Sequence, residues 1–465
     1  MNTIKEQSTS MSQKKNCLQL IENILEKIYD LPDGPFWIAD LRNKKYSFPI
    51  MLGVGNGSYI HINPEIDGLL AQLSSSILQE YFRQHEENFS NPEWERMVKK
   101  AFGEALVGAD EESISRKEAE KTLDAVVEKV KDSINEIQER EHVFGCDLCN
   151  IEDLKRLVVG PVSFEPRNAW LERIHDKGNI SEIAVSRIQK IWRGETLRER
   201  VPSEDSIKEE EIIDVIGKCK FACSVRISKA GTDAGLNRAL TAARLAMTVI
   251  ALFWKDSSYA LERIGLTYDR TEYLQKRLSF SFEGRFSYGR TWTHIPGGIT
   301  ELKKEEWEQI PKDLKINFPC AEEVIIYAAD GQSSVTRPEI MHVFFQALLW
   351  FHEGCREKVD AMAIVKFCAV LEALSCGRKE NGIFNLVNAR LKINDEIGFR
   401  DKLRRIYKMG RSRTVHGTND KLLHDWSDDR KFAEELCRLC LLSCLELASQ
   451  ESTLKDPHMF SVSDK

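Results

Sequence analysis

The chain of 465 residues lacks a long apolar segment. Its first residues, MNTIKEQSTSMSQKKNCLQL, contain no apolar run of signal-peptide length. The longest apolar stretches, such as residues 245–254 (LAMTVIALFW), are too short to span a bilayer. These absences predict a cytoplasmic protein without a membrane partner.

The chain also lacks an excess of positive charge and any complete phosphate-binding loop. Its formal net charge is −7, so a nucleic-acid site has to be a local basic patch within an acidic protein. The glycines at 53–57 (GVGNG) lack the strand, the helix and the lysine of a phosphate loop. The loop at 228–232 precedes an apolar helix whose N-terminus could hold a phosphate, but a simple loop and cap is the favoured interpretation.

Paired metal-binding cysteines are lacking as well. Twelve cysteines are present, and several lie inside apolar helical patterns, as free buried cysteines do in a reducing compartment. Cys146 and Cys149 have metal-like spacing, and His142 is the one further ligand nearby. A metal-dependent enzyme built on these three residues stays an alternative, but we expect no metal and no cofactor.

Residues 1–335 combine helical and strand patterns, which predicts an α+β region. No internal repeat is present. We expect disorder at 1–14 and a turn at 43–44. Helices are expected at 17–28, 64–90, 92–106, 152–159 and 181–194, strands within 35–53 and at 160–164, 221–227 and 322–331, and a surface loop at 203–211.

A long charged helix is predicted after residue 115. Its apolar residues recur at intervals of three and four, which gives one apolar stripe. The stripe consists of Leu123, Val126, Val130, Ile134 and Ile137. The helix either packs on its own domain or forms a coiled coil in a dimer.

The composition changes at Arg337, after which no strand pattern remains. Five helical segments follow, joined by short polar loops, and they predict a helix bundle. The fold class is therefore α+β, mostly helical, with an all-α bundle at the C-terminal end. The predicted divisions are an N-terminal region at 1–145 with the long charged helix, a second α+β region and possible sensor at 146–335, the bundle at 336–450 and a tail at 451–465.

The fourth helix of this bundle carries the residues with the most chemical interest. It ends in YKMGRSRTVHG, residues 407–417, where Gly417 is a natural residue to follow a helix end. His416 is then placed at the helix terminus, and histidine is suited to proton transfer near neutral pH. Residues 390–413 contain nine Lys or Arg and three acidic residues, a local net charge of +6 that favours polyanion binding.

This arrangement resembles the HEPN superfamily, in particular its Apea-like branch in prokaryotic defence proteins. The resemblance covers residues 337–450: a helix of the type AVLEAL (369–374), a variable loop, the segment 407–417 and a closing apolar helix. The HEPN signature is an arginine, a polar residue and a histidine after a spacer of four to six residues. Arg411, Ser412 and His416 fit this signature with four residues between Arg411 and His416.

The resemblance implies metal-independent RNA cleavage, in which the ribose 2′-OH attacks the adjacent phosphate and leaves a 2′,3′-cyclic phosphate. His416 would move the protons and Arg411 would stabilise the negatively charged phosphorane. Ser412 would bind the phosphate or hold Arg411, and Glu372 would orient Arg411 or His416. The neighbouring side chains expected to bind RNA are Arg404, Arg405, Tyr407, Lys408 and Arg413.

Helix geometry adds an expectation about assembly. Residues five apart on an ideal α-helix point about 140° apart, so Arg411 and His416 of one chain need not meet. HEPN domains are typically dimers with a composite site, so we expect a homodimer through this region. The resemblance implies an RNase effector of antiphage defence (abortive infection) or a toxin that cleaves cellular RNA such as tRNA, with a phage-derived or nucleotide trigger. An inactive HEPN module that binds nucleotides, RNA or proteins is the alternative.

Overall fold

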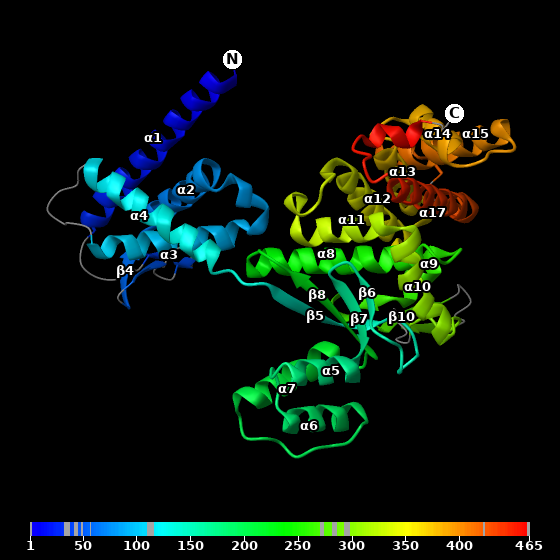
Figure 1. Ribbon diagram of the computed structural model, residues 1–465, viewed down its shortest axis with the longest axis horizontal. Helices are drawn as coiled ribbons and strands as arrows, with labels where there is room; N and C mark the ends of the chain where they lie inside the picture. Colours follow the sequence, from blue (N-terminus) through cyan, green and yellow to red (C-terminus); the bar gives the residue numbers. More distant parts are fainter. Residues whose placement is uncertain are drawn as a thin grey trace. The chain divides into compact units, whose positions relative to one another are not determined.

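The computed structural model describes residues 2–31, 38–40, 45–47, 50–55, 57–108, 116–269, 274–280, 286–292, 298–421 and 424–462. These residues form two compact units. Unit 1 comprises residues 1–139 and 228–237, and unit 2 comprises residues 140–227 and 238–465. Most described residues are helical, and short antiparallel sheets complete the predicted α+β fold (Figure 1).

Unit 1 is built mainly from helices. They are α1 (Asn2–Tyr29), α2 (Pro64–Tyr81), α3 (Asn91–Ala105) and α4 (Arg116–Asn135). Two antiparallel hairpins accompany them, β1–β2 (Ile38–Asp40 and Lys45–Ser47) and β3–β4 (Ile50–Val54 and Ser58–Ile62). Helix α1 begins at Asn2, within the segment expected to be disordered. The turn expected at 43–44 lies outside the described residues.

The apolar stripe of α4 packs inside unit 1. Leu123 is 1% exposed, Val126 and Val130 are fully buried, and all three belong to one core with residues of α1, α2 and α3. Burial of such a stripe is the main stabilisation of an amphipathic helix. The packed helix is therefore supported over the coiled-coil alternative.

The loop at 228–232 leads into α8 (Thr232–Ala251), whose N-terminus is capped by a carboxylate. Glu93 accepts hydrogen bonds from the backbone N–H groups of Asp233, at 2.6 Å, and Ala234, at 3.2 Å. Burial opposes the charged form of Glu93, but these hydrogen bonds and those from Ser90 lower its pKa below the ordinary value. A protein carboxylate therefore occupies the position where a phosphate could have bound.

The centre of unit 2 is an antiparallel sheet with strand order β6-β7-β8-β5-β9. Its strands are β5 (Arg140–Asp147), β6 (Leu157–Val159), β7 (Val162–Pro166), β8 (Phe221–Ile227) and β9 (Gly265–Leu266). Strand β8 coincides with the predicted strand at 221–227, and β5 pairs with it through Phe144 opposite Cys223. The division expected between residues 145 and 146 falls inside β5.

Two expectations beside this sheet are wrong. The helix expected at 152–159 is replaced by β6, in which Leu157 and Val159 are buried and Val158 is exposed, so the period is that of a strand. The surface loop expected at 203–211 belongs to helix α7 (Glu204–Ile216). Ser203 caps this helix by accepting a hydrogen bond from the backbone N–H of Ser206 at 3.1 Å, and the first turn carries two acidic residues that favour a helix N-terminus.

The strand expected at 322–331 is also wrong, because this segment lies in helix α11 (Pro319–Asp330). Its buried residues are spaced by three and four, as on one face of a helix. They are Ala321, Val324, Ile325, Ala328 and Ala329, together with Cys320. Pro319 stands in the first turn, where the missing N–H costs nothing.

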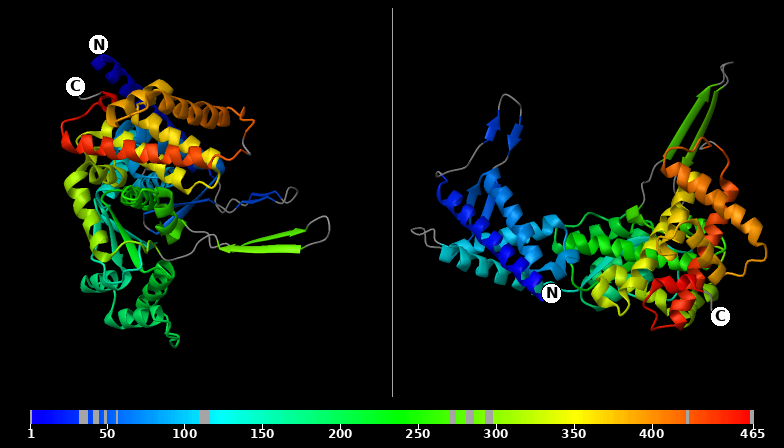
Figure 2. Two further views of the ribbon diagram at one scale, coloured as in Figure 1. Left: turned by 90° about the vertical axis from the view of Figure 1, so that its right-hand side faces the viewer. Right: turned by 90° about the horizontal axis from the view of Figure 1, so that it is seen from above.

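Several other elements belong to unit 2. They are α5 (Arg167–Asp176), α6 (Glu182–Trp192), α9 (Ser257–Arg263), α10 (Lys304–Asn317) and the hairpin β10–β11 (Leu274–Phe280 and Phe286–Trp292). Figure 1 shows α5, α6 and α7 grouped at one side of the sheet, and Figure 2 shows the hairpin extending away from the rest of the unit. Among the described helices, none combines the length and the apolar sequence needed to cross a bilayer.

The five helical segments expected after Arg337 are all present in unit 2. They are α12 (Pro338–Arg356), α13 (Asp360–Leu374), α14 (Glu380–Arg390), a fourth helix over 396–415 and α17 (Ser427–Gln450). Helix α13 packs against both α12 and α17 and is buried along most of its length. Within the region expected to be a tail, Phe460 is fully buried and its ring packs on Phe344 of α12.

The cysteines are free, as predicted, and all are buried except the half-buried Cys376. Burial raises the pKa of the Cys149 thiol to about 11. Within the described ranges, no three His, Cys, Asp or Glu side chains converge as metal ligands would.

Candidate functional site

The helix that carries the Arg411–His416 motif is continuous but not uniform. It consists of α15 (Glu396–Arg404), η5 (Arg405–Ser412) and α16 (Arg413–Val415), here called the motif helix. The segment η5 is a π-helix, and the backbone N–H of Arg413 donates to the carbonyl of Lys408, five residues earlier. The ideal α-helix assumed from the sequence is therefore wrong here. π-helical segments are rare and occur often at functional sites.

The motif helix ends at the predicted position. The last helical residue is Val415, His416 caps it, and Gly417 follows with a positive φ of 68°. The backbone N–H of Thr418 donates to the carbonyl of Arg413 at 2.8 Å, and that of Gly417 donates to Thr414 at 3.2 Å. This pair of bonds is the Schellman motif, which closes a helix through a residue such as glycine. The His416 side chain is exposed at this end.

Arg411 is held by a carboxylate from a different helix. One guanidinium nitrogen of Arg411 donates to Glu372 of α13 at 2.9 Å, and the Tyr407 hydroxyl donates to the other oxygen of Glu372 at 2.7 Å. Burial and this hydrogen bond to Glu372 raise the pKa of Tyr407 well above its ordinary value, so the phenol stays a donor. Glu372 therefore fixes two residues of the motif helix at once.

A glycine allows the two helices to approach this closely. Gly410 is buried, and a Cβ atom built on it would lie 2.7 Å from Cγ2 of Ile364 on α13. Beside it, the buried thiol of Cys368 lies 3.8 Å from the carbonyl oxygen of Ile406, to which it can donate. The contact of Gly410 and Cys368 with the neighbouring helix was not predicted from the sequence. A glycine inside a helical pattern is nevertheless a recognisable signal of close packing.

We expect Gly410→Ala to destabilise unit 2 by about 1–3 kcal/mol, because the added methyl group must displace Ile364 or the motif helix. Thermal or urea unfolding of the whole protein measures this change. Gly68→Ala is the matched control, because Gly68 also lies inside a helix but has open space around its Cβ position. The control should be neutral or slightly stabilising. Equal effects of the two substitutions would contradict the close contact.

The other predicted site residues do not join this cluster. Ser412 is half-buried and His416 is exposed, and neither makes a side-chain hydrogen bond with any residue that the structure describes. The structure thus brings together Arg411, Tyr407 and Glu372. Within one chain, no hydrogen bond or ion pair connects His416 to them.

The basic stretch is more neutral in the folded protein than in the sequence. Most of its cations face an acidic residue that lies outside residues 390–413. These ion pairs are Arg404–Glu380 at 3.4 Å, Lys408–Glu380 at 3.6 Å, Arg405–Asp429 at 2.8 Å, Arg411–Glu372 at 2.9 Å and Arg413–Asp420 at 3.5 Å. The net charge counted along the sequence therefore overstates the local positive charge, because these acids come from other elements.

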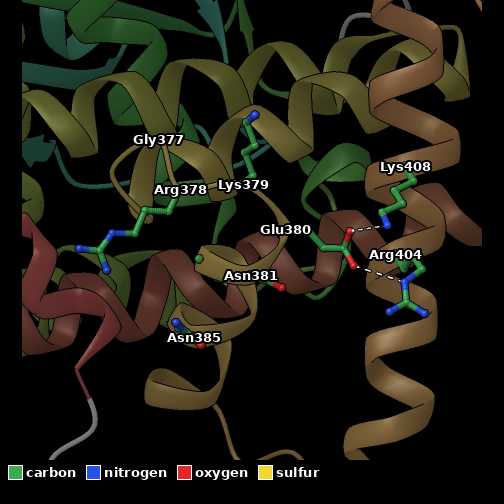
Figure 3. Close-up of a pocket in the computed structure, with 9 residues that line it drawn as sticks. Gly377, Arg378, Lys379, Glu380, Asn381, Asn385, Arg404 and Lys408 are labelled. Carbon is green, nitrogen blue, oxygen red and sulfur yellow. Dashed lines mark ion pairs between the residues drawn. The ribbon is translucent and has the colours of Figure 1, made fainter.

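Two of these pairs border an open pocket of about 670 Å³ between the motif helix and the start of α14. Arg404 and Lys408 lie on one side, and Glu380 points toward both of them (Figure 3). Arg378, Lys379, Asn381 and Asn385 complete its polar lining. Of these lining residues, only Arg404 and Lys408 were expected from the sequence to bind RNA.

No family model, no curated protein and no solved structure matches the chain. The candidate site is therefore defined by the contacts among the chain's own residues, with the Glu372–Tyr407–Arg411 cluster at its centre.

Proposed function

We propose that this protein is a metal-independent endoribonuclease of the HEPN type. It acts in the cytoplasm as an antiphage-defence or toxin effector, on cellular RNA such as tRNA. The N-terminal region senses a trigger or restrains the nuclease. The observation that carries this proposal is the fixed Arg411, held by Glu372 and Tyr407, just before an exposed histidine at the end of the same helix.

The chemistry of these side chains suits cleavage of a phosphodiester. The reaction needs a proton donor and acceptor at the 2′-OH and the leaving 5′ oxygen, and a cation for the phosphorane. His416 supplies the first, and its exposed position lets a substrate reach it. Arg411 supplies the second, and its side chain keeps 27% of its surface exposed beside Glu372.

A homodimer completes the proposed site. His416 makes no contact with the Arg411 cluster by hydrogen bond or ion pair within the described residues of one chain. Val415, directly beside His416 in the chain, is 52% exposed, and a second chain that supplies its own His416 here would cover it. The partner would then place its own His416 opposite Arg411.

A second candidate function is an inactive module that binds RNA, nucleotides or proteins without cutting. The ion pairs of the basic stretch favour the protein-binding form of this module over the RNA-binding one, because a cation already paired with a carboxylate binds an added phosphate less strongly. Intact Arg411 and His416 favour the nuclease.

We expect the purified protein to cut total cellular RNA and to leave 2′,3′-cyclic phosphate ends, also in the presence of a chelator. Mapping of the cut ends measures both the activity and its chemistry. The candidate trigger should be tested in parallel, as phage lysate and as a nucleotide pool. A protein that binds RNA but never cuts it, with or without these triggers, would establish the binding module instead.

A further inference from the structure

We propose that the pocket beside Glu380 binds the sugar–phosphate backbone of single-stranded RNA, with Glu380 as a built-in competitor that the RNA phosphates displace. This inference rests on the proposed function and extends it, because it adds a strand-binding site beyond the cleavage centre. It is carried by the residues that line the pocket (Figure 3).

The pocket carries a surplus of positive charge. Its lining contains four cations, Arg378, Lys379, Arg404 and Lys408, against the single carboxylate of Glu380, a formal net charge of +3. Asn381 and Asn385 add amide groups that can donate to phosphate or ribose oxygens. Apolar side chains are missing from the lining residues, as expected for a site that contacts a polar, charged ligand.

The cations lie on two sides of the pocket. Figure 3 shows Arg378 pointing away on one side of Glu380, and Arg404 and Lys408 on the other side. Successive phosphates of a strand can contact the cations on both sides. Phosphate contacts of this kind position a nucleic acid without reading its sequence.

The loop that carries Arg378 is closed by a helix-end motif and a side-chain hydrogen bond. Helix α13 ends in a Schellman motif, in which Gly377 N–H donates to the carbonyl of Glu372 at 2.7 Å and Cys376 takes a positive φ of 56°. Positive φ is unusual for a residue with a side chain and marks a constrained backbone. The buried Ser375 hydroxyl also lies 3.1 Å from the carbonyl oxygen of Arg378, to which it can donate. Because Glu372 stands at the start of this turn, one residue connects the Arg411 cluster to the pocket.

Glu380 forms ion pairs with two of these cations, Arg404 and Lys408. Its two oxygens lie 3.4 Å from Arg404 and 3.6 Å from Lys408, which are long distances for ion pairs between half-exposed cations and a carboxylate. Arg404 and Lys408 keep 55% and 60% of their side-chain surface exposed. An RNA phosphate can therefore take the place of Glu380.

The pocket lies within reach of the cleavage centre. Lys408 and His416 stand eight residues apart at the end of the motif helix, at most about 12 Å along its axis, because its π-helical part rises less per residue than an α-helix. About three or four stacked nucleotides cover this distance. A strand cut at His416 would therefore place its neighbouring phosphates in the pocket.

The test measures RNA binding rather than cleavage. A fluorescent single-stranded oligoribonucleotide of about ten nucleotides is titrated by anisotropy against the full-length His416→Ala protein. We expect Arg404→Ala and Lys408→Ala each to weaken binding about tenfold, and to reduce the slope of log K against log salt by about 0.7 per lost phosphate contact. Glu380→Gln should strengthen binding several-fold, a change that a folding defect cannot produce.

Lys358→Ala is the matched control, because this lysine is 81% exposed and lies at the opposite end of α13. The control should bind as its parent does. Equal binding by all variants would overturn the inference, as would competition by a free mononucleotide at the same concentration as the oligoribonucleotide, which would indicate a nucleotide pocket. The binding assay does not depend on cutting, so its result is independent of the proposed nuclease activity. A protein without nuclease activity can still bind RNA in this pocket, and an active nuclease can lack this binding site.

Discussion

His416→Ala is expected to lower the rate of RNA cleavage by about 10²- to 10⁴-fold, the range that general acid–base catalysis contributes. Alanine cannot exchange a proton with the 2′-OH or the leaving oxygen. Because the side chain is exposed and makes no hydrogen bond with described residues, the stability of the protein should not change. Single-turnover cleavage of a defined RNA and thermal unfolding measure the two quantities.

His175→Ala is the matched control for this substitution. His175 also lies in the last turn of a helix and is 39% exposed, but it belongs to α5 and stands outside the motif. Its replacement should leave cleavage unchanged. Equal activity of His416→Ala and wild type would exclude His416 from the chemistry and leave the binding module as the better candidate.

Mixing two inactive variants tests the expected dimer. In a composite site, Arg411 of one chain works with His416 of the other, so Arg411→Ala and His416→Ala chains together rebuild one intact site in each mixed dimer. Equal mixing should restore about a quarter of the wild-type activity, because half of the dimers are mixed and each has one of two sites. Mixtures as inactive as their components would show that each site belongs to one chain.

Arg411→Ala is expected to lower cleavage by about 10²- to 10³-fold, the loss typical of removing one group that stabilises transition-state charge. Arg411→Lys should recover little of this activity, because lysine cannot donate in the planar, two-pronged geometry of arginine. The substitution also leaves Glu372 with the Tyr407 hydroxyl alone, a loss of about 1 kcal/mol for a pair that keeps some solvent contact.

Glu372→Gln separates positioning from charge in the same cluster. The glutamine side chain keeps the shape but offers one acceptor oxygen to two donors, Tyr407 and Arg411. Cleavage should fall less than for Arg411→Ala, and the unfolding midpoint should fall more. Arg193→Ala is the control for Arg411→Ala, because this exposed arginine pairs with Glu195 just beyond the end of α6. Full activity of Arg411→Ala would contradict the role of the guanidinium.

Local patterns predicted most helices and the strand β8 correctly. In these segments the helical or strand spacing of the apolar residues can be recognised without reference to the rest of the chain. The wrong predictions concern short apolar segments whose spacing is compatible with both a helix and a strand. Residues 322–331 contain β-branched residues but bury a helical face, and Leu157 and Val159 form a strand only because β7 pairs with them. Packing against other elements decides such segments.

The sequence by itself determined the end of the motif helix, because the positive φ that closes it suits Gly417 at low cost. Only the tertiary structure decided how this helix is used. Glu372 reaches Arg411 from 39 residues away, Gly410 and the π-helical segment set the approach of the two helices, and acids of distant elements neutralise much of the basic stretch. The local charge around the motif and the contacts of its residues depend on distances between residues that are far apart in the sequence. These distances cannot be obtained from the order of residues along the chain.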